Sequence, residues 1–101
     1  MSNLFMVKGG RLATPRLEEC GVEGIMRGLI LDLAEEMGIP CRLSALSQLD
    51  LQAADELFLC NALIGLWPVR RVDRHAYTIG PVTRLLGERL RARQLDMQNE
   101  L

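Results

Sequence analysis

Three consecutive residues, Gly24, Ile25 and Met26, stand where a helical apolar pattern begins, and this position could bind an anion. A helix N-terminus carries unpaired backbone N–H groups and a partial positive charge. Most helices cover these donors with a Ser, Thr, Asp or Asn side chain, which Gly24 lacks. A phosphate could therefore approach the N–H groups of Ile25 and Met26. The alternative is a plain glycine turn into a helix, and the spacing alone favours that alternative.

A second candidate is the pair Asn61 and Ala62, which follows a compact apolar run at residues 56–60. Such a run indicates a buried strand. Loops that leave strand ends are common ligand positions. In the alternative interpretation the Asn61 side chain bonds its own backbone in a turn. The residues alone leave both interpretations open.

Lys8 and His75 invite a catalytic interpretation, but we assign no catalytic residue and no metal site. Lys8 is the only lysine, and it precedes Gly9-Gly10 at the expected tip of a hairpin, where it should be solvated. A lysine that binds a cofactor covalently needs a desolvated setting that lowers its pKa. His75 has no second ligand at metal spacing, so a surface or strand histidine is the better interpretation.

The apolar and turn patterns around these residues predict alternating strands and helices. The expected strands are 4–8, 11–14, 41–46, 56–60, 66–72 and 75–79, and the expected helices are 24–37, 48–54 and 81–93. Residues 16–23 are expected to form a loop or a short helical turn. Gly38 should end the first helix, Pro68 suggests an edge strand or a bulge, and Pro81 suits a first helical position. The polar tail after Arg93 is expected to fray.

Composition excludes several classes of function. The chain has 101 residues with 49% hydrophobic and 25% charged residues, as expected of one globular domain, and its net charge of −1 provides no general attraction to nucleic acid or membranes. The C-terminal third is basic, but interleaved acids favour a solvated face over nucleic-acid binding. Its arginines are Arg70, Arg71, Arg74, Arg84, Arg89, Arg91 and Arg93.

The cysteines, the length of the apolar runs and the first residues of the sequence indicate the cellular compartment. Three cysteines, Cys20, Cys41 and Cys60, form no Cys-x-x-Cys pair, and reduced thiols are the simplest interpretation. No apolar run approaches the roughly 20 residues that span a bilayer. The first residues lack the pattern of a signal peptide. We therefore expect a cytoplasmic protein.

Four ordered segments together resemble the fold-type IV pyridoxal-phosphate enzymes, a family of aminotransferases and lyases. The segments are residues 2–10, Thr14-Pro15 with 20–27, residues 54–62, and residues 65–69 with Gly80-Pro81. The resemblance implies an α/β fold with a mixed sheet and packed helices, in which 1–101 form a single cofactor-phosphate-binding subdomain at the C-terminal end of a larger enzyme. It also implies pyridoxal phosphate as cofactor. Gly24, Ile25, Met26, Asn61 and Ala62 would hold its phosphate.

Within this family, the sequences Cys20-Gly21-Val22 and Cys60-Asn61-Ala62-Leu63 resemble the lyase members. Met26 and Asn61-Ala62 depart from the aminotransferase pattern and weigh against a branched-chain or D-amino acid aminotransferase. The family's cofactor-binding lysine lies upstream of the segment that begins at Ser2, so we expect the isolated chain to be inactive. A fragment of an aminotransferase and a non-catalytic interaction module are the alternatives.

The family forms dimers, and a homodimer is expected here. The candidates for its apolar surface are Leu4, Phe5, Leu63, Ile64, Leu66 and Trp67. Trp67 is expected in the core or at a subunit contact rather than on a substrate. The expected partners are a second copy and a small-molecule substrate of the full enzyme, with no nucleic acid and no membrane.

Overall fold

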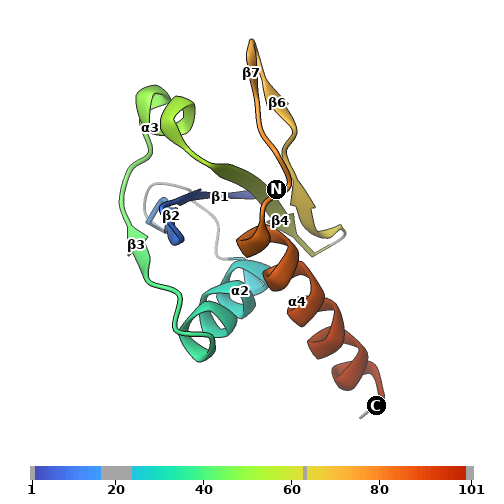
Figure 1. The fold of residues 1–101 in the computed structure, drawn as a ribbon. Coiled ribbons are helices and arrows are strands. Elements are labelled where there is room, and N and C mark those ends of the chain that lie inside the picture. The colour runs from blue at the N-terminus through green and yellow to red at the C-terminus, as the bar shows by residue number, and fades with distance from the viewer. Residues whose placement is uncertain (1, 17–23, 63, 100–101) are drawn as a thin grey trace.

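A computed structural model describes residues 2–16, 24–62 and 64–99. Of the loop expected at 16–23, residues 17–23 lie outside the described residues, and so do Cys20 within it and Leu63. Figure 1 shows a sheet with two helices on one face and a short helix and a hairpin extending beyond the other face. The strands are β1 Asn3–Lys8, β2 Arg11–Thr14, β3 Cys41–Leu43, β4 Glu56–Asn61, β5 Gly65–Pro68, β6 Arg71–Val72 and β7 His75–Ala76. The helices are α2 Ile25–Glu36, α3 Gln48–Ala53 and α4 Pro81–Asn99.

The main sheet has five strands in the order β3-β2-β1-β4-β5. Only β2 and β3 pair in parallel, so the mixed α/β sheet is confirmed. Gly9 and Gly10, with φ of 58° and 75°, form the two-residue turn between β1 and β2. Positive φ at both positions gives the turn whose twist matches that of antiparallel strands. The hairpin therefore fixes the register in which Val7 faces Leu12.

Helix α2 packs one face on the sheet because its apolar residues recur at helical spacing. Met26, Ile30, Leu33 and Ala34 are buried. The helix ends at Glu36, and Gly38 follows two residues later with a φ of +71°. There the N–H groups of Gly38 and Ile39 donate to the carbonyls of Glu35 and Ala34 at 3.1 and 2.8 Å. This C-terminal motif requires the left-handed conformation that glycine adopts without strain.

Two apolar clusters lie on opposite faces of the sheet. The larger cluster joins Phe5, Val7, Leu12 and Phe58 of the sheet to α2 and to Leu86 and Leu90 of α4. At its centre the Phe5 and Phe58 rings stack with their centroids 5.0 Å apart. The smaller cluster is built on Met6, Ala13 and Leu57.

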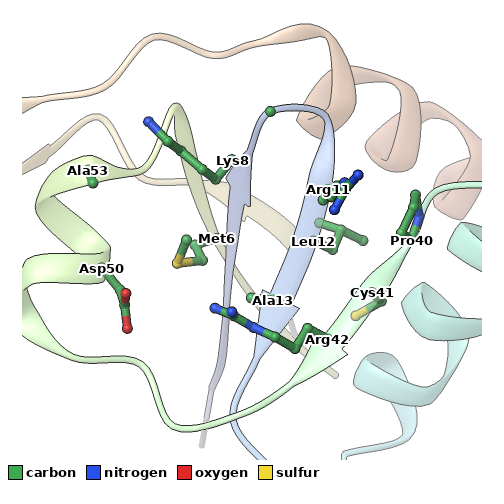
Figure 2. Close-up of a pocket in the computed structure, with 11 residues that line it drawn as sticks. Met6, Lys8, Arg11, Leu12, Ala13, Pro40, Cys41, Arg42, Asp50 and Ala53 are labelled. Carbon is green, nitrogen blue, oxygen red and sulfur yellow. The ribbon is translucent and has the colours of Figure 1, made fainter.

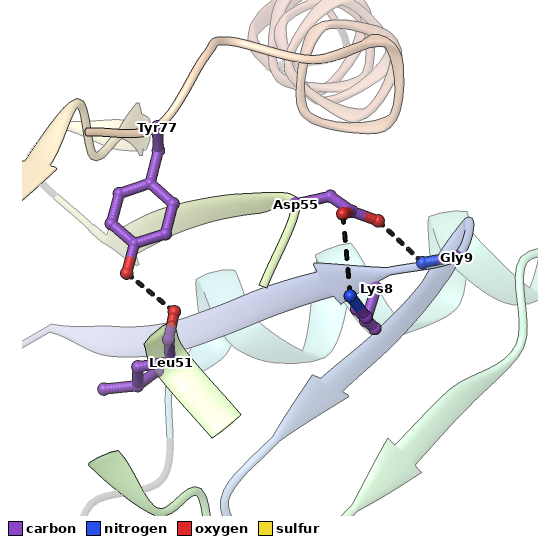
Figure 3. A network of polar contacts seen from close by, with 5 residues as sticks. All are labelled: Lys8, Gly9, Leu51, Asp55 and Tyr77. Atoms are coloured by element: carbon purple, nitrogen blue, oxygen red, sulfur yellow. Dashed lines mark hydrogen bonds and ion pairs between the residues drawn. The ribbon is translucent and has the colours of Figure 1, made fainter. Parts of the chain in front are cut away.

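Polar contacts attach the connecting segments to the second face. The Tyr77 hydroxyl donates to the Leu51 carbonyl at 2.6 Å, and Asp55 accepts from the Gly9 N–H at 2.8 Å (Figure 3). The Lys8 ammonium lies 3.9 Å from Asp55. These contacts hold α3 and the β6–β7 hairpin near the end of β1 that is distant from Asn3.

Several expectations about elements were wrong in detail. The expected strand 66–72 is two strands, with β5 at the edge of the sheet as Pro68 suggested. The expected strands 41–46 and 75–79 are much shorter, because β3 pairs along only three residues and β7 along two. Helix α4 continues to Asn99 instead of fraying after Arg93, whose side chain pairs with Glu36 at 2.8 Å.

Burial also differs from expectation at three side chains. Phe5 is fully buried and offers no surface to a partner. Trp67 is 59% exposed and is not in the core, because it lies on an edge strand. Arg27 is only 5% exposed, although an arginine on a helix normally lies on the solvent side.

Candidate functional site

The N-cap residue of α2 provides no side-chain cap. Gly24 occupies this position in an extended conformation, and no side chain among the described residues bonds to the first-turn N–H groups. The first bond along the helix runs from the Gly28 N–H to the Gly24 carbonyl at 3.1 Å. The N–H groups of Ile25, Met26 and Arg27 therefore have no partner within the helix. The Ile25 side chain, at the first position of the helix, is 81% exposed, whereas Met26 and Arg27 are buried.

The other two described helices begin differently. At α3, the Ser47 hydroxyl accepts from the Asp50 N–H at 3.1 Å, and the Asp50 carboxylate accepts from the Ser47 N–H at 2.9 Å. At α4, the buried Glu56 carboxylate accepts from the Thr83 N–H at 2.8 Å. Both therefore have a carboxylate near their positive end, whereas the first turn of α2 contains no acidic residue. Only α2, among the helices the structure describes, keeps its N-terminus available to an external anion.

Gly24 is required by close packing at this end of α2. An added Cβ at Gly24 would collide with the Oδ1 atom of Asn3. Asn3 is 6% exposed and begins β1, so the glycine lets a polar side chain of the central sheet reach the helix start. The sequence interpretation explained Gly24 by space for a phosphate. The structure adds contact with Asn3 as a separate reason for glycine.

The Asn61 side chain organises the loop between β4 and β5. Its Oδ1 accepts from the Ile64 N–H at 2.8 Å, and its Nδ2 donates to the Ser2 hydroxyl at 2.9 Å. The turn interpretation of Asn61 is therefore confirmed. Ala62 is exposed at the turn, and Gly65 closes the loop with a φ of +69°. The Asn61 side chain is engaged in these bonds, so at Asn61 and Ala62 a ligand would be bound by backbone groups.

Residues Ser2 and Asn3 connect the two candidate segments. Asn3 pairs with Cys60 across β1 and β4 and contacts Gly24, while Ser2 bonds Asn61. The α2 start and the 61–62 loop therefore flank the same end of the sheet. Ser2 and Asn3 belong to one of the segments that resemble the family, but no role was predicted for them. Two polar residues directly before an apolar strand were the available signal.

Arg27 is a buried cation close to the start of α2. Its Nη2 donates to the Pro15 carbonyl at 2.8 Å, whereas its buried Nε has no partner among the described groups. The guanidinium lies near two thiols and lowers their pKa slightly, although burial dominates and raises the pKa of Cys60 to about 11. Arg27 was missed because an arginine at a helical polar position normally points to solvent.

The structure also shows the surroundings of Met26, Lys8, His75 and two of the cysteines. Met26 is buried in the larger cluster, so its possible contribution to a ligand is its backbone N–H. Lys8 is exposed on the surface, as expected, and His75 is exposed on β7.

Among the described residues no group of three His, Cys, Asp or Glu side chains could hold a metal ion. No helix within the described ranges is long and apolar enough to cross a membrane. Cys41 and Cys60 are free thiols.

Comparison with known proteins identifies the family. The family model for class IV amino-transferases matches residues 1–72. A probable branched-chain-amino-acid aminotransferase of Thermotoga maritima is 39% identical over 86% of this chain and 33% of its own length. The aminodeoxychorismate lyase of Vibrio harveyi is 36% identical over 85% of the chain and 33% of its own length.

A solved structure supports the same assignment. The 4-amino-4-deoxychorismate lyase of Pseudomonas aeruginosa superimposes with a TM-score of 0.86 and 44% identity, covering 91% of this chain and 34% of that one. The chain therefore spans about a third of the length of the relatives it matches. Both sequence and structure show that the chain belongs to the class IV aminotransferase family, whose members are aminotransferases and lyases that use pyridoxal phosphate.

Proposed function

We propose that this chain binds the phosphate of pyridoxal phosphate at the start of α2, as the C-terminal cofactor-phosphate-binding part of an aminodeoxychorismate lyase. The observation that carries this proposal is the uncapped N-terminus of α2 beside the 61–62 loop. The N–H groups of Ile25 and Met26 would donate to the phosphate, and the N–H of Ala62 would complete the site from the second segment.

The donor set fits a phosphate group. Backbone N–H groups at a helix N-terminus bind phosphate without a charged side chain, because the helix dipole favours negative charge there. No acidic side chain occupies the first turn, and the exposed Ile25 leaves the approach open. The buried guanidinium of Arg27 adds positive charge on the same turn. The site therefore has both the donors and the charge that a phosphate requires.

When bound, the cofactor supplies an electron sink for a developing carbanion. The residues of this chain contribute by holding the phosphate end and so fixing the position of the ring. Asn3 and Gly24 set the position of the helix start relative to the sheet, and the Ser2–Asn61 bond sets that of the second loop. We assign no proton transfer to any described residue.

The choice of a lyase over an aminotransferase is supported by Met26 and by the Asn61-Ala62 pair, which depart from the aminotransferase pattern. The 44% identity to the Pseudomonas lyase also favours a lyase. The Thermotoga aminotransferase, at 39% identity, keeps a branched-chain aminotransferase as the second candidate. The lyase would form 4-aminobenzoate and pyruvate for folate synthesis, as a cytoplasmic homodimer.

Two experiments test the proposal at its two levels. In the first, amide chemical shifts of the chain are followed while pyridoxal phosphate, inorganic phosphate or pyridoxal is added. Phosphate and the cofactor should move the amides of Ile25, Met26 and Ala62, and pyridoxal should not. Shifts confined to other residues would refute the site.

The second experiment uses the full-length protein that contains this segment. Pyruvate release from aminodeoxychorismate, without transfer of an amino group from glutamate to a branched-chain 2-oxo acid, would support the lyase. The opposite result would make the protein an aminotransferase and leave the phosphate site standing.

A further inference from the structure

A cavity of about 720 Å³ lies on the face of the sheet that α2 and α4 leave uncovered. Figure 2 shows it between α3 and the strands β1, β2 and β3. Its volume falls within the range of roughly 300–1,000 Å³ that is typical of small-molecule sites. Its apolar lining includes Met6, Ala13 and Pro40. The cavity can therefore hold a ligand with an apolar body.

Three cationic side chains surround this cavity because of the strand register. Lys8 pairs directly with Arg11 across the hairpin, and Arg42 pairs with Ala13 on the neighbouring strand. Like charges that face each other across antiparallel strands destabilise a sheet. All three line the cavity, together with Asp50 (Figure 2). Asp55, 3.9 Å from the Lys8 ammonium, offsets part of this repulsion, and a bound anion would offset more of it.

The charges near the cavity leave one positive charge unbalanced. The Lys8 ammonium lies 3.9 Å from Asp55. Arg42 acts electrostatically on Asp50, although bonds from Ser47 are the larger reason why the pKa of Asp50 is lowered. Arg11 has no carboxylate partner among the residues described. Three cations against two carboxylates therefore favour a ligand with a single negative charge.

The cavity is separate from the candidate cofactor site. Strand β1 begins with Asn3 beside the α2 start and ends with Lys8 at the cavity. Six residues of extended strand span roughly 17–20 Å. A ligand in the cavity and a phosphate at α2 therefore do not compete for the same groups.

We infer that this cavity is a second binding site, for a monoanionic organic acid whose carboxylate lies against Arg11 and Arg42 and whose apolar body rests on Met6 and Ala13. Arginine is suited to this role because its planar guanidinium binds carboxylates through paired hydrogen bonds. The inference does not depend on the proposed cofactor site, because it uses none of that site's residues.

The test compares three probes by their effect on backbone amide shifts of the chain. Benzoate has both the carboxylate and the apolar body, acetate has the carboxylate with little apolar surface, and benzyl alcohol has the body without the charge. We expect benzoate to move the amides at 8–13, 40–42 and 50–53, and to bind about fivefold or more tightly than either other probe, since the carboxylate and the apolar contacts both contribute. Equal binding of acetate and benzoate, or no movement at these positions, would overturn the inference.

Matched substitutions show whether the named cations hold the ligand. Arg42→Gln and Arg11→Gln should each weaken benzoate binding about fivefold or more, because each removes one charged hydrogen-bond donor. Arg91→Gln makes the same charge change at an exposed position of α4 outside the cavity. It should change the affinity for benzoate by less than about twofold, because exposed distant charges are screened by salt. Because Arg11 and Arg42 are both exposed, folding should survive, and amide spectra check this. Equal weakening by Arg91→Gln and Arg42→Gln would overturn the inference.

Discussion

The buried contact between Glu56 and the start of α4 gives the sharpest stability prediction. Glu56 is 4% exposed, and its Oε1 accepts from the Thr83 N–H at 2.8 Å. An added Cβ at Gly80 would collide with the same carboxyl group. The carboxyl group and the absence of a side chain at Gly80 are therefore two parts of one contact, and substitutions at the two positions should not be additive.

The magnitudes follow from the hydrogen bond and the helix end. Glu56→Ala removes a charge-assisted cap and should lower the free energy of unfolding by about 2 kcal/mol. Gly80→Ala displaces the carboxylate from Thr83 and should also cost about 2 kcal/mol. In the Glu56→Ala background the added methyl has nothing to displace, so Gly80→Ala should then cost less than about 0.5 kcal/mol. The expected coupling energy is therefore about 1.5–2 kcal/mol.

Urea unfolding followed by circular dichroism measures this double-mutant cycle. Gly87→Ala is the matched control, because it lies in the same helix and its added Cβ would approach only Leu66, at 3.9 Å. It should stabilise the chain by up to about 1 kcal/mol in both backgrounds. Additive effects of Glu56→Ala and Gly80→Ala would refute the reasoning about the contact.

Three further outcomes are expected. Thr83→Val should be neutral or stabilise the chain by about 1 kcal/mol in urea unfolding, because the buried Thr83 hydroxyl has no partner in the described structure and its loss leaves nothing unsatisfied; a loss of more than about 1 kcal/mol would contradict this. Burial raises the pKa of Cys60 from 9.0 to about 11, so its contribution to stability is complete below pH 9 and is lost as the pH rises toward 11. The free energy of unfolding should fall by roughly 2–3 kcal/mol over this pH range, and it should depend less steeply on pH in Cys60→Ala. An unchanged slope in Cys60→Ala would show that Cys60 does not cause the pH dependence. The chain should also form a two-fold dimer, since Ile64 and Trp67 are exposed apolar side chains at the edge strand β5; a strictly monomeric chain in light scattering would refute this. It should show no lyase or aminotransferase turnover, because its only lysine, Lys8, is exposed on the surface, and an active chain would refute that expectation.

The order and type of the main elements could be predicted because local signals were strong. Gly9-Gly10 specified the hairpin, the spacing from Met26 to Ala34 specified α2, and Gly38 specified its end. The boundaries of β3, β5 and β7 could not be predicted, because they depend on how far a partner strand extends.

The candidate site was only partly accessible to sequence reasoning. The uncapped helix start was visible as Gly24, since the absence of a capping side chain is a local property. The roles of Asn3 and Arg27 were not visible, because their burial is created by segments distant in sequence. Residue types alone left two interpretations of Asn61 open, and the structure places its side chain in the turn, while a role of its backbone in binding phosphate stays a prediction.

The central claim, that the α2 N-terminus binds the cofactor phosphate, is tested most directly by Ile25→Glu beside Ile25→Gln. Gly24 is unsuitable for this test because any side chain there collides with Asn3. Ile25 is 81% exposed, so both variants should fold, and a carboxylate in the first turn should stabilise α2 by roughly 0.3–1 kcal/mol.

The measurement is the affinity of each variant for inorganic phosphate and pyridoxal phosphate, from amide shifts at residues 25, 26 and 62. Ile25→Glu should weaken phosphate binding about tenfold relative to Ile25→Gln, because it places a negative charge beside the donors while leaving them in place. Equal affinity of the two folded variants would contradict the account.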